Sequence, residues 1–261
     1  MLANYHLTEN KFLPNILSVG LIPQQGKRSN LIGDHKKAIF YSKGYEGVIA
    51  MFFMMIERFV EYRGDYGDIH IDAYKAFMEM ARKRQEQGLV INQTLENAIN
   101  REKRIIDVIN AVRSSEDWRS FLGEGVCLRL DNVQEENVEA SEFTFYNSWT
   151  TLSVPPKDIS VVVLRNRETG AQLTSKYNII DYFVSKTPLD SMRKLLYDTD
   201  AKESKRESHL LWQIMSRYYS DNEDSIRTFY RNYDIGEVPL AMYLNIENGR
   251  LRGRNEGGLN R

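Results

Sequence analysis

Apolar and polar residues alternate with two different periods along the chain, and the period changes where strands give way to helices. Short apolar strands are predicted over residues 4–7 and 38–42, and the helix between them ends near Ser18. Gly20 supplies the left-handed backbone position that closes such a helix. Residues 22–37 are polar and rich in turn formers, which predicts a loop of functional length before the second strand.

The next part of the chain is predicted to be helical. A buried helix runs from Glu46 to about Tyr62, because that segment is apolar on nearly every face. Residues 72–122 carry apolar side chains at helical spacing with charges on the complementary face, which indicates a packed helical insertion over residues 65–122. Strands are then predicted over residues 125–130, 143–153 and 159–164.

The pattern changes to helices from about residue 178. Helices are predicted over residues 178–184, 189–197, 205–219 and 224–233, with a short strand or last turn over residues 240–246. We interpret residues 1–170 as one domain that contains the insertion. Residues 171–261 are then a helical carboxy-terminal region that ends in a flexible basic tail, whose arginines are candidates for phosphate contacts. Separate runs of strands and helices predict the α+β class.

Composition narrows the classes of partner. Hydrophobic residues make up 42% of the chain and charged residues 27%, and the formal net charge is -1, so neither nucleic acid nor a membrane is expected as an obligate partner. The apolar run over residues 48–56 is too short to span a bilayer. The single cysteine, Cys127, lies in a predicted strand, where we expect it to be a small buried hydrophobe. It fits a reducing compartment, and no secretory signal is visible, so the expected location is the cytoplasm.

The first strand carries the clearest chemistry. His6 and Thr8 are two residues apart, so a strand places the imidazole and the hydroxyl on the same face. The four histidines are far apart in sequence and no Cys-x-x-Cys or His-x-x-x-His spacing occurs, so no metal site is expected. Glycine-rich phosphate loops are also absent from the sequence, which argues against the common nucleotide-binding folds.

These residues carry a family resemblance. His6-x-Thr8, then Asn15-Ile16-Leu17-Ser18-x-Gly20-Leu21, a loop, and Ala38-Ile39-Phe40-Tyr41-Ser42-Lys43 resemble the NAD-binding half of ADP-ribosyltransferases of the diphtheria-toxin and poly(ADP-ribose) polymerase type. The match covers residues 4–55, and beyond them it rests on strand order alone. The resemblance implies a split, mostly antiparallel sheet, NAD as substrate and no metal.

The resemblance also implies roles for individual residues in holding NAD. It assigns His6 to a ribose hydroxyl of NAD, with Thr8 supporting the site, and Arg28 in the loop is the residue best suited to the pyrophosphate. An aromatic ring should stack on nicotinamide. The candidates are Phe40, Tyr41 and Tyr45, and Ser42 lines the same wall as these rings.

The sequence departs from the family pattern at the catalytic acid. The family places a glutamate on a later strand, where it stabilises the positive charge that develops on the ribose. Residues 146–151 contain no acid. If the strand begins earlier, Glu142 is the candidate for the catalytic carboxylate. If the family's position falls on Asn147, the chain offers a neutral amide there instead. A further alternative is an acid from another part of the chain, such as Glu46 or Glu139.

The resemblance therefore implies transfer of ADP-ribose from NAD to a macromolecular acceptor, either protein or nucleic acid, with release of nicotinamide. Two alternatives stay open. One is a relative of the RNA 2'-phosphotransferases, which share the fold and use NAD but need basic residues to hold an RNA phosphate. The other is a catalytically inactive member of the fold that binds a nucleotide or a protein.

Overall fold

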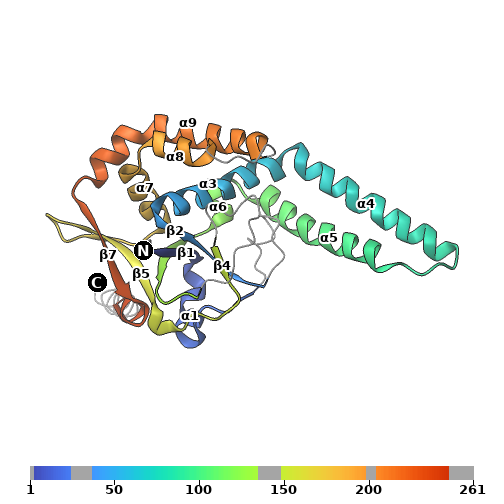
Figure 1. Ribbon diagram of the computed structural model, residues 1–261, viewed down its shortest axis with the longest axis horizontal. Coiled ribbons are helices and arrows are strands. Elements are labelled where there is room, and N and C mark those ends of the chain that lie inside the picture. The colour runs from blue at the N-terminus through green and yellow to red at the C-terminus, as the bar shows by residue number, and fades with distance from the viewer. Residues whose placement is uncertain (1–2, 25–36, 135–147, 198–203, 247–261) are drawn as a thin grey trace, which may run out of the picture. The chain divides into compact units, whose positions relative to one another are not determined.

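The computed structural model describes residues 3–24, 37–134, 148–197 and 204–246 (Figure 1). The chain divides into two compact units. The first consists of residues 1–24, 37–53 and 124–261, and the second consists of residues 25–36 and 54–123. The expected insertion over residues 65–122 thus forms most of the second unit.

The first unit is built on a seven-stranded sheet. Six strands lie in the order β4-β2-β1-β3-β5-β6, and β7 pairs with β5. All pairings between the described strands are antiparallel, which confirms the α+β class with a mostly antiparallel sheet. The strands span Asn4–Glu9 (β1), Ile39–Lys43 (β2), Gly125–Leu130 (β3), Ser148–Thr150 (β4), Ile159–Asn166 (β5), Gln172–Leu173 (β6) and Tyr233–Pro239 (β7).

Helices cover both faces of this sheet. On one face Leu128 of β3 and Val161 of β5 form a cross-strand pair, and both pack in a core that includes Leu13 of α1. On the other face the ring of Tyr5 lies 5.5 Å from the ring of Phe183 in α7. The helical segments of this unit are η1 (Asn10–Phe12), α1 (Leu13–Val19), the first half of α3 (Gly44–Arg63), η2 (Pro156–Asp158), α7 (Lys176–Lys186), α8 (Leu189–Tyr197) and α9 (Ser204–Tyr230).

The turn after α1 forms as the sequence predicts. Gly20 follows the helix with φ at +82°, and a Cβ at this position would lie 2.3 Å from the carbonyl oxygen of Val154. Only glycine fits both constraints. Leu21 then exchanges two backbone hydrogen bonds with Val154, at 2.9 and 3.0 Å. The loop that leaves α1 is therefore fixed to the sheet at its first residue.

The carboxy-terminal region completes the sheet, which corrects the domain boundary expected near residue 170. β7 pairs with β5 from Tyr233 opposite Asn166 to Pro239 opposite Ser160, and the whole region belongs to the first unit. The pairing joins segments far apart in sequence, which periodicity does not reveal. The two helices expected over residues 205–219 and 224–233 are one helix, α9, of 27 residues. Its polar stretch near Asn222 contains neither proline nor glycine, so the helix continues through it.

The second unit is helical, as expected. It contains the second half of α3 and then α4 (Asp65–Glu86), α5 (Gln93–Ser114) and α6 (Trp118–Leu122), and α4 packs on α5 as a hairpin. The side chain of Asn92 caps α5 by accepting a hydrogen bond of 2.9 Å from the Leu95 amide. Glu102 of α5 is buried, and its carboxylate lies 2.7 Å from both the His70 imidazole and the Arg101 guanidinium, so its charge has hydrogen-bonding partners.

One buried hydroxyl in α9 is left without a partner. Tyr219 is completely buried, and its Oη makes no hydrogen bond within the described part of the chain. Burial raises the pKa of Tyr219. Tyr230, on the same helix, instead donates a hydrogen bond of 2.9 Å to the side-chain oxygen of Asn178.

We expect Tyr219→Phe to stabilise the protein by about 1 kcal/mol, because it removes an unsatisfied buried hydroxyl and keeps the ring. The matched control, Tyr230→Phe, should lose about 1 kcal/mol with its hydrogen bond. Above a pH of about 10 the wild type should lose stability, because its unfolded chain releases the Tyr219 proton and its folded form keeps it. Tyr219→Phe lacks this proton, so it should lose less stability than the wild type in that range. Urea unfolding of both variants at neutral and alkaline pH measures these differences. Equal changes at neutral pH would contradict the assignment. At alkaline pH both variants should lose less stability than the wild type, because burial raises the pKa of Tyr230 as well.

Candidate functional site

The sheet opens between β1 and β2. These strands pair only at one end, where Asn4 lies opposite Lys43 and Tyr5 lies opposite Ser42. Beyond that end β1 stays paired with β3 along its 6 residues, whereas β2 pairs with β4 through Ile39 to Tyr41. β1 and β2 therefore separate like the arms of a fork. We call this opening the β1–β2 fork, and His6, Thr8 and residues 39–41 lie along its two arms.

A single side chain bridges the two arms. The Nδ1 atom of His6 lies 2.7 Å from the carbonyl oxygen of Phe40. A carbonyl oxygen only accepts hydrogen bonds, so Nδ1 must carry the hydrogen. In the neutral ring Nε2 then has a lone pair and acts as an acceptor. The fold thus fixes both the orientation and the tautomer of the histidine.

Cross-strand pairing also decides which predicted site residues share a face. Because partners on neighbouring strands point to the same side, Ser42 and Phe40 lie on the face of Tyr5. His6 and Thr8 lie on the opposite face, together with Tyr41. The structure therefore divides between two faces the residues that the sequence places on one wall.

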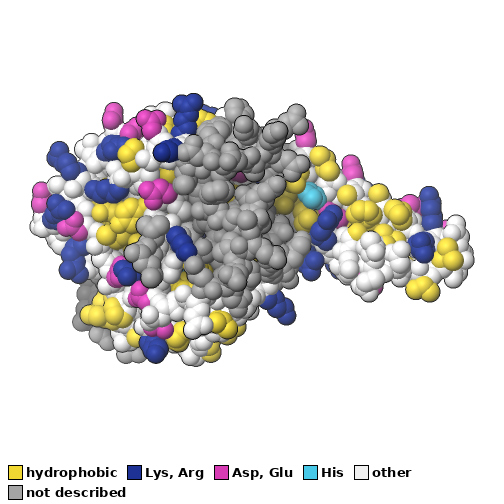
Figure 2. Space-filling model, viewed as in Figure 1, with side chains coloured by type: hydrophobic (Ala, Val, Ile, Leu, Met, Phe, Trp, Pro, Cys, Tyr) yellow, Lys and Arg dark blue, Asp and Glu magenta, His cyan; other side chains and the backbone are white. Residues whose placement is uncertain are grey.

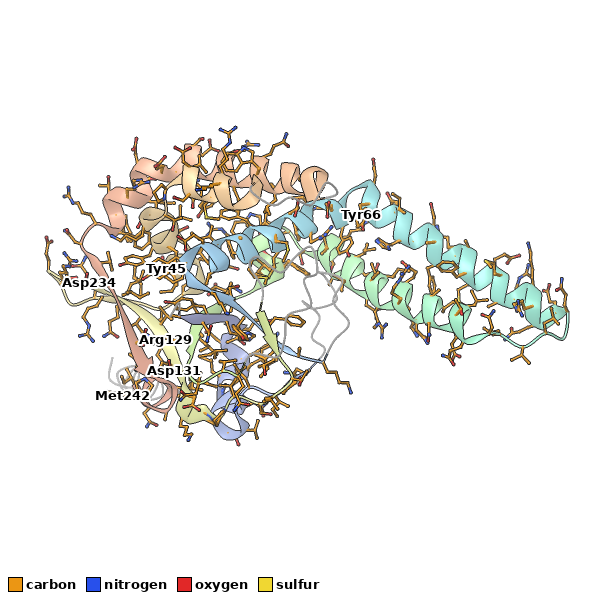
Figure 3. The ribbon with its side chains drawn as sticks, viewed as in Figure 1. Tyr45, Tyr66, Arg129, Asp131, Asp234 and Met242 are labelled. Carbon is orange, nitrogen blue, oxygen red and sulfur yellow. The ribbon has the colours of Figure 1, made fainter. Side chains whose placement is uncertain are left out.

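The three candidate aromatic residues have different surroundings. Tyr41 is 1% exposed and belongs to the hydrophobic core, so its ring has no face to offer a ligand, and the proposed stacking role does not fit it. Tyr45 stacks on Phe183, with ring centroids 4.2 Å apart and planes 16° apart (Figure 3). Phe40 is half-buried and contributes its carbonyl oxygen to His6. Phe40 and Tyr45 thus remain as candidates.

Thr8 is held in place by a glycine that the sequence analysis did not single out. Thr8 is buried and lies opposite Val126 of β3. A Cβ at the neighbouring Gly125 would lie 2.1 Å from the Thr8 carbonyl oxygen and 3.2 Å from Cδ of Lys176. Lys176 is itself buried, at the first turn of α7. A lysine that opens a helix gives no sequence signal of burial, because this position is usually solvated.

A second polar cluster lies on the Tyr5 face of the sheet. Arg129, opposite Tyr5 on β3, forms ion pairs with Asp131 and with Glu237 of β7 (Figure 3). Burial raises the pKa of Tyr5, and the nearby Tyr45 and Glu237 add to this shift. Burial also raises the pKa of Tyr45, again with Glu237 nearby. Both phenols are therefore neutral donors at physiological pH.

The catalytic candidates are largely beyond what the structure describes. Arg28, Glu139, Glu142 and Asn147 lie outside the described residues. The described part of β4, Ser148–Thr150, contains no carboxylate in its sequence. Glu46 lies in the first turn of α3 and is half-buried.

Further observations concern other classes of site. Within the described segments, no group of three or more metal-ligating side chains occurs, and no helix is long and apolar enough to cross a membrane. Cys127 is fully buried as expected, and burial raises the pKa of its thiol. A hollow of about 210 Å³ lies beside residues 132–134 and 150–155, and none of the predicted site residues lines it.

Comparison of the chain with protein-family models, curated proteins and solved structures found no match.

Proposed function

We propose that this protein binds NAD at the β1–β2 fork and transfers its ADP-ribose to a macromolecular acceptor, with release of nicotinamide. The observation that carries the proposal is the hydrogen bond from His6 to the Phe40 carbonyl across the fork. It presents Nε2 as an acceptor, which is the chemistry needed to receive a hydrogen bond from a ribose hydroxyl. Among the described residues, β1, α1 and β2 follow one another as strand, helix and strand, in line with the resemblance of residues 4–55.

Each remaining part of the proposed site has a defined role. Thr8 supports His6 from the same strand face. Phe40 or Tyr45, on the other face of the sheet, supplies the ring for nicotinamide, so the proposed dinucleotide passes through the opening between β1 and β2. Arg28 binds the pyrophosphate, and Ser42 lies on the Phe40 side of β2. A carboxylate near the ribose stabilises the oxocarbenium-like charge as the bond to nicotinamide breaks. We assign this role to Glu142, with Asn147 as the position that binds the ribose without charge. The reduced thiol of Cys127 fits the cytoplasm as the site of the activity.

Binding can be tested through His6. Calorimetric titration with NAD should show saturable binding to the wild type, and His6→Ala should weaken it roughly tenfold, the effect of losing one well-placed hydrogen bond. Asn4→Ala is the matched control, because Asn4 lies two residues earlier on the same strand face, at the closed end of the fork. Its affinity should equal that of the wild type. Both variants should remain folded at the temperature of the titration, with His6→Ala less stable by about 1 kcal/mol because it loses the bond to the Phe40 carbonyl. No binding to the wild type, or equal affinity in all three proteins, would contradict the proposed NAD site.

Turnover can be tested at Glu142, the residue to which we assign the catalytic carboxylate. Glu142→Gln should reduce nicotinamide release from NAD by about 100-fold or more, because charge stabilisation is lost while the side chain keeps its size. Asn147→Ala should mainly weaken binding, since a neutral amide contributes a hydrogen bond. Chromatographic detection of nicotinamide measures both variants.

A second function is favoured by one observation, namely that the described part of β4 carries no carboxylate in its sequence. This function is NAD binding without catalysis. Tight binding with no nicotinamide release from the wild type would establish it and exclude transfer.

A further inference from the structure

Helix α4 carries an apolar stripe that α5 does not cover. Ile69 is 62% exposed, Met80 53% and Tyr66 41%. α5 packs on a neighbouring face of α4, where Gly67 and Ala81 are buried and His70 bonds to Glu102. We define the α4 stripe as five residues at three- and four-residue spacing, of which Ala73 is half-buried and the others are exposed: Tyr66, Ile69, Ala73, Ala76 and Met80.

Such a stripe indicates a partner. Monomeric proteins rarely expose contiguous apolar surface along a helix. The ring of Tyr66 is also held in place, because it stacks on Tyr62 and meets the His70 ring edge-on. A rigid, partly exposed aromatic residue is the type of anchor found at the centre of protein interfaces. Hydrophobic side chains are visible along this hairpin in Figure 2.

We propose that the α4 stripe binds the same stripe of a second copy of this chain, with the two helices antiparallel. The two alanines lie near the middle of the stripe, where small side chains allow two helices to approach closely. In the antiparallel register that places Ala73 against the partner's Ala76, Ile69 packs on the partner's Met80. The stem of Lys83 then lies over the partner's Tyr66, an arrangement that suits a cation and an aromatic face.

The distribution of charge selects the antiparallel direction. The first turn of α4 contains Asp65 and Asp68, and its last turn contains Lys83 and Arg84. Two of these charges also have partners within the chain, since Asp68 lies 2.8 Å from Arg113 and Lys83 lies 3.6 Å from Glu79. Antiparallel packing brings the acidic end of each helix to the basic end of the other, and it also opposes the two helix dipoles. A parallel pair would place like charges together at both ends.

Acidic residues that border the stripe do not prevent this pairing. Asp72 forms an ion pair of 2.9 Å with Lys75 on its own helix. Glu79 and Glu86 do the same with Arg82, at 2.9 and 3.1 Å. Their charges are thus partly compensated before a second copy approaches.

Exposed apolar residues at both ends of the α4–α5 hairpin would enlarge the proposed interface. Leu89 and Val90 lie in the exposed turn between α4 and α5, and the antiparallel register carries this turn past the partner's Tyr66. Val60 is exposed near that end. Two hairpins joined in this way make a four-helix arrangement, a common way to bury amphipathic helices.

Sedimentation velocity of the full chain over a range of concentrations tests the association. We expect a reversible dimer whose dissociation constant rises at least about tenfold in Ile69→Glu, because a buried apolar side chain becomes a charge. Met78→Glu is the matched control: Met78 lies on the same helix, is 43% exposed and is outside the stripe. This variant should dimerise like the wild type. A monomeric wild type, or equal dissociation of both variants, would overturn the proposal.

Cysteine cross-linking tests the direction. Ile69 and Met80 are about 16 Å apart along one helix, too far for a bond within a chain. The double variant Ile69→Cys with Met80→Cys should therefore form a covalent dimer under mild oxidation, and each single variant should not. Cys127 is buried and will not interfere. Cross-linking of Ile69→Cys alone would show a parallel pair and contradict the antiparallel register, as would failure of the double variant to cross-link in a dimeric protein.

Discussion

The hydrogen bond between His6 and the Phe40 carbonyl is the interaction on which the proposed site depends. β1 and β2 share two residue pairs and then follow different neighbours, so an unpaired stretch of backbone faces the opening. The Nδ1 atom of His6 lies 2.7 Å from the Phe40 carbonyl oxygen, so the ring bridges the two strands. Because Nδ1 is the donor, the other nitrogen of the neutral ring is an acceptor. One contact thus maintains the opening and defines its chemistry.

The rest of the first unit holds these two strands in place. β3 approaches β1 so closely that Gly125 has no room for a side chain, and this approach fixes Thr8. Gly20 and Leu21 attach the end of α1 to Val154 beyond β4, which anchors the loop that leaves the helix. On the face of the sheet that carries His6, Tyr41 packs β2 against the core. On the other face, Tyr45 stacks on Phe183. Packing and backbone contacts therefore hold both arms of the fork.

Local patterns in the sequence predicted most helices and strands. The elements that differ from the prediction depend on contacts between residues far apart in sequence. The helix before Gly20, the strand Gly125–Leu130 and the helix Leu189–Tyr197 follow from turn chemistry and periodicity. The place of β7 does not, because its partner β5 is remote in sequence and a seven-residue strand after a long helix resembles the helix end. For the site, sequence spacing correctly places His6 beside Thr8. It does not reveal that Tyr41 faces the core or that Lys176 is buried, because both depend on which face of an element meets a neighbour.

The tautomer of His6 is the most direct measure of the proposed site. A long-range nitrogen–proton NMR spectrum of the histidine rings, assigned by comparison with His6→Gln, reports which ring nitrogen carries the hydrogen. For the neutral ring the account predicts a proton on Nδ1 and a lone pair on Nε2, with the Nε2 resonance shifting when NAD is added. A neutral ring with its proton on Nε2, or an Nε2 resonance unchanged at saturating NAD, would contradict it.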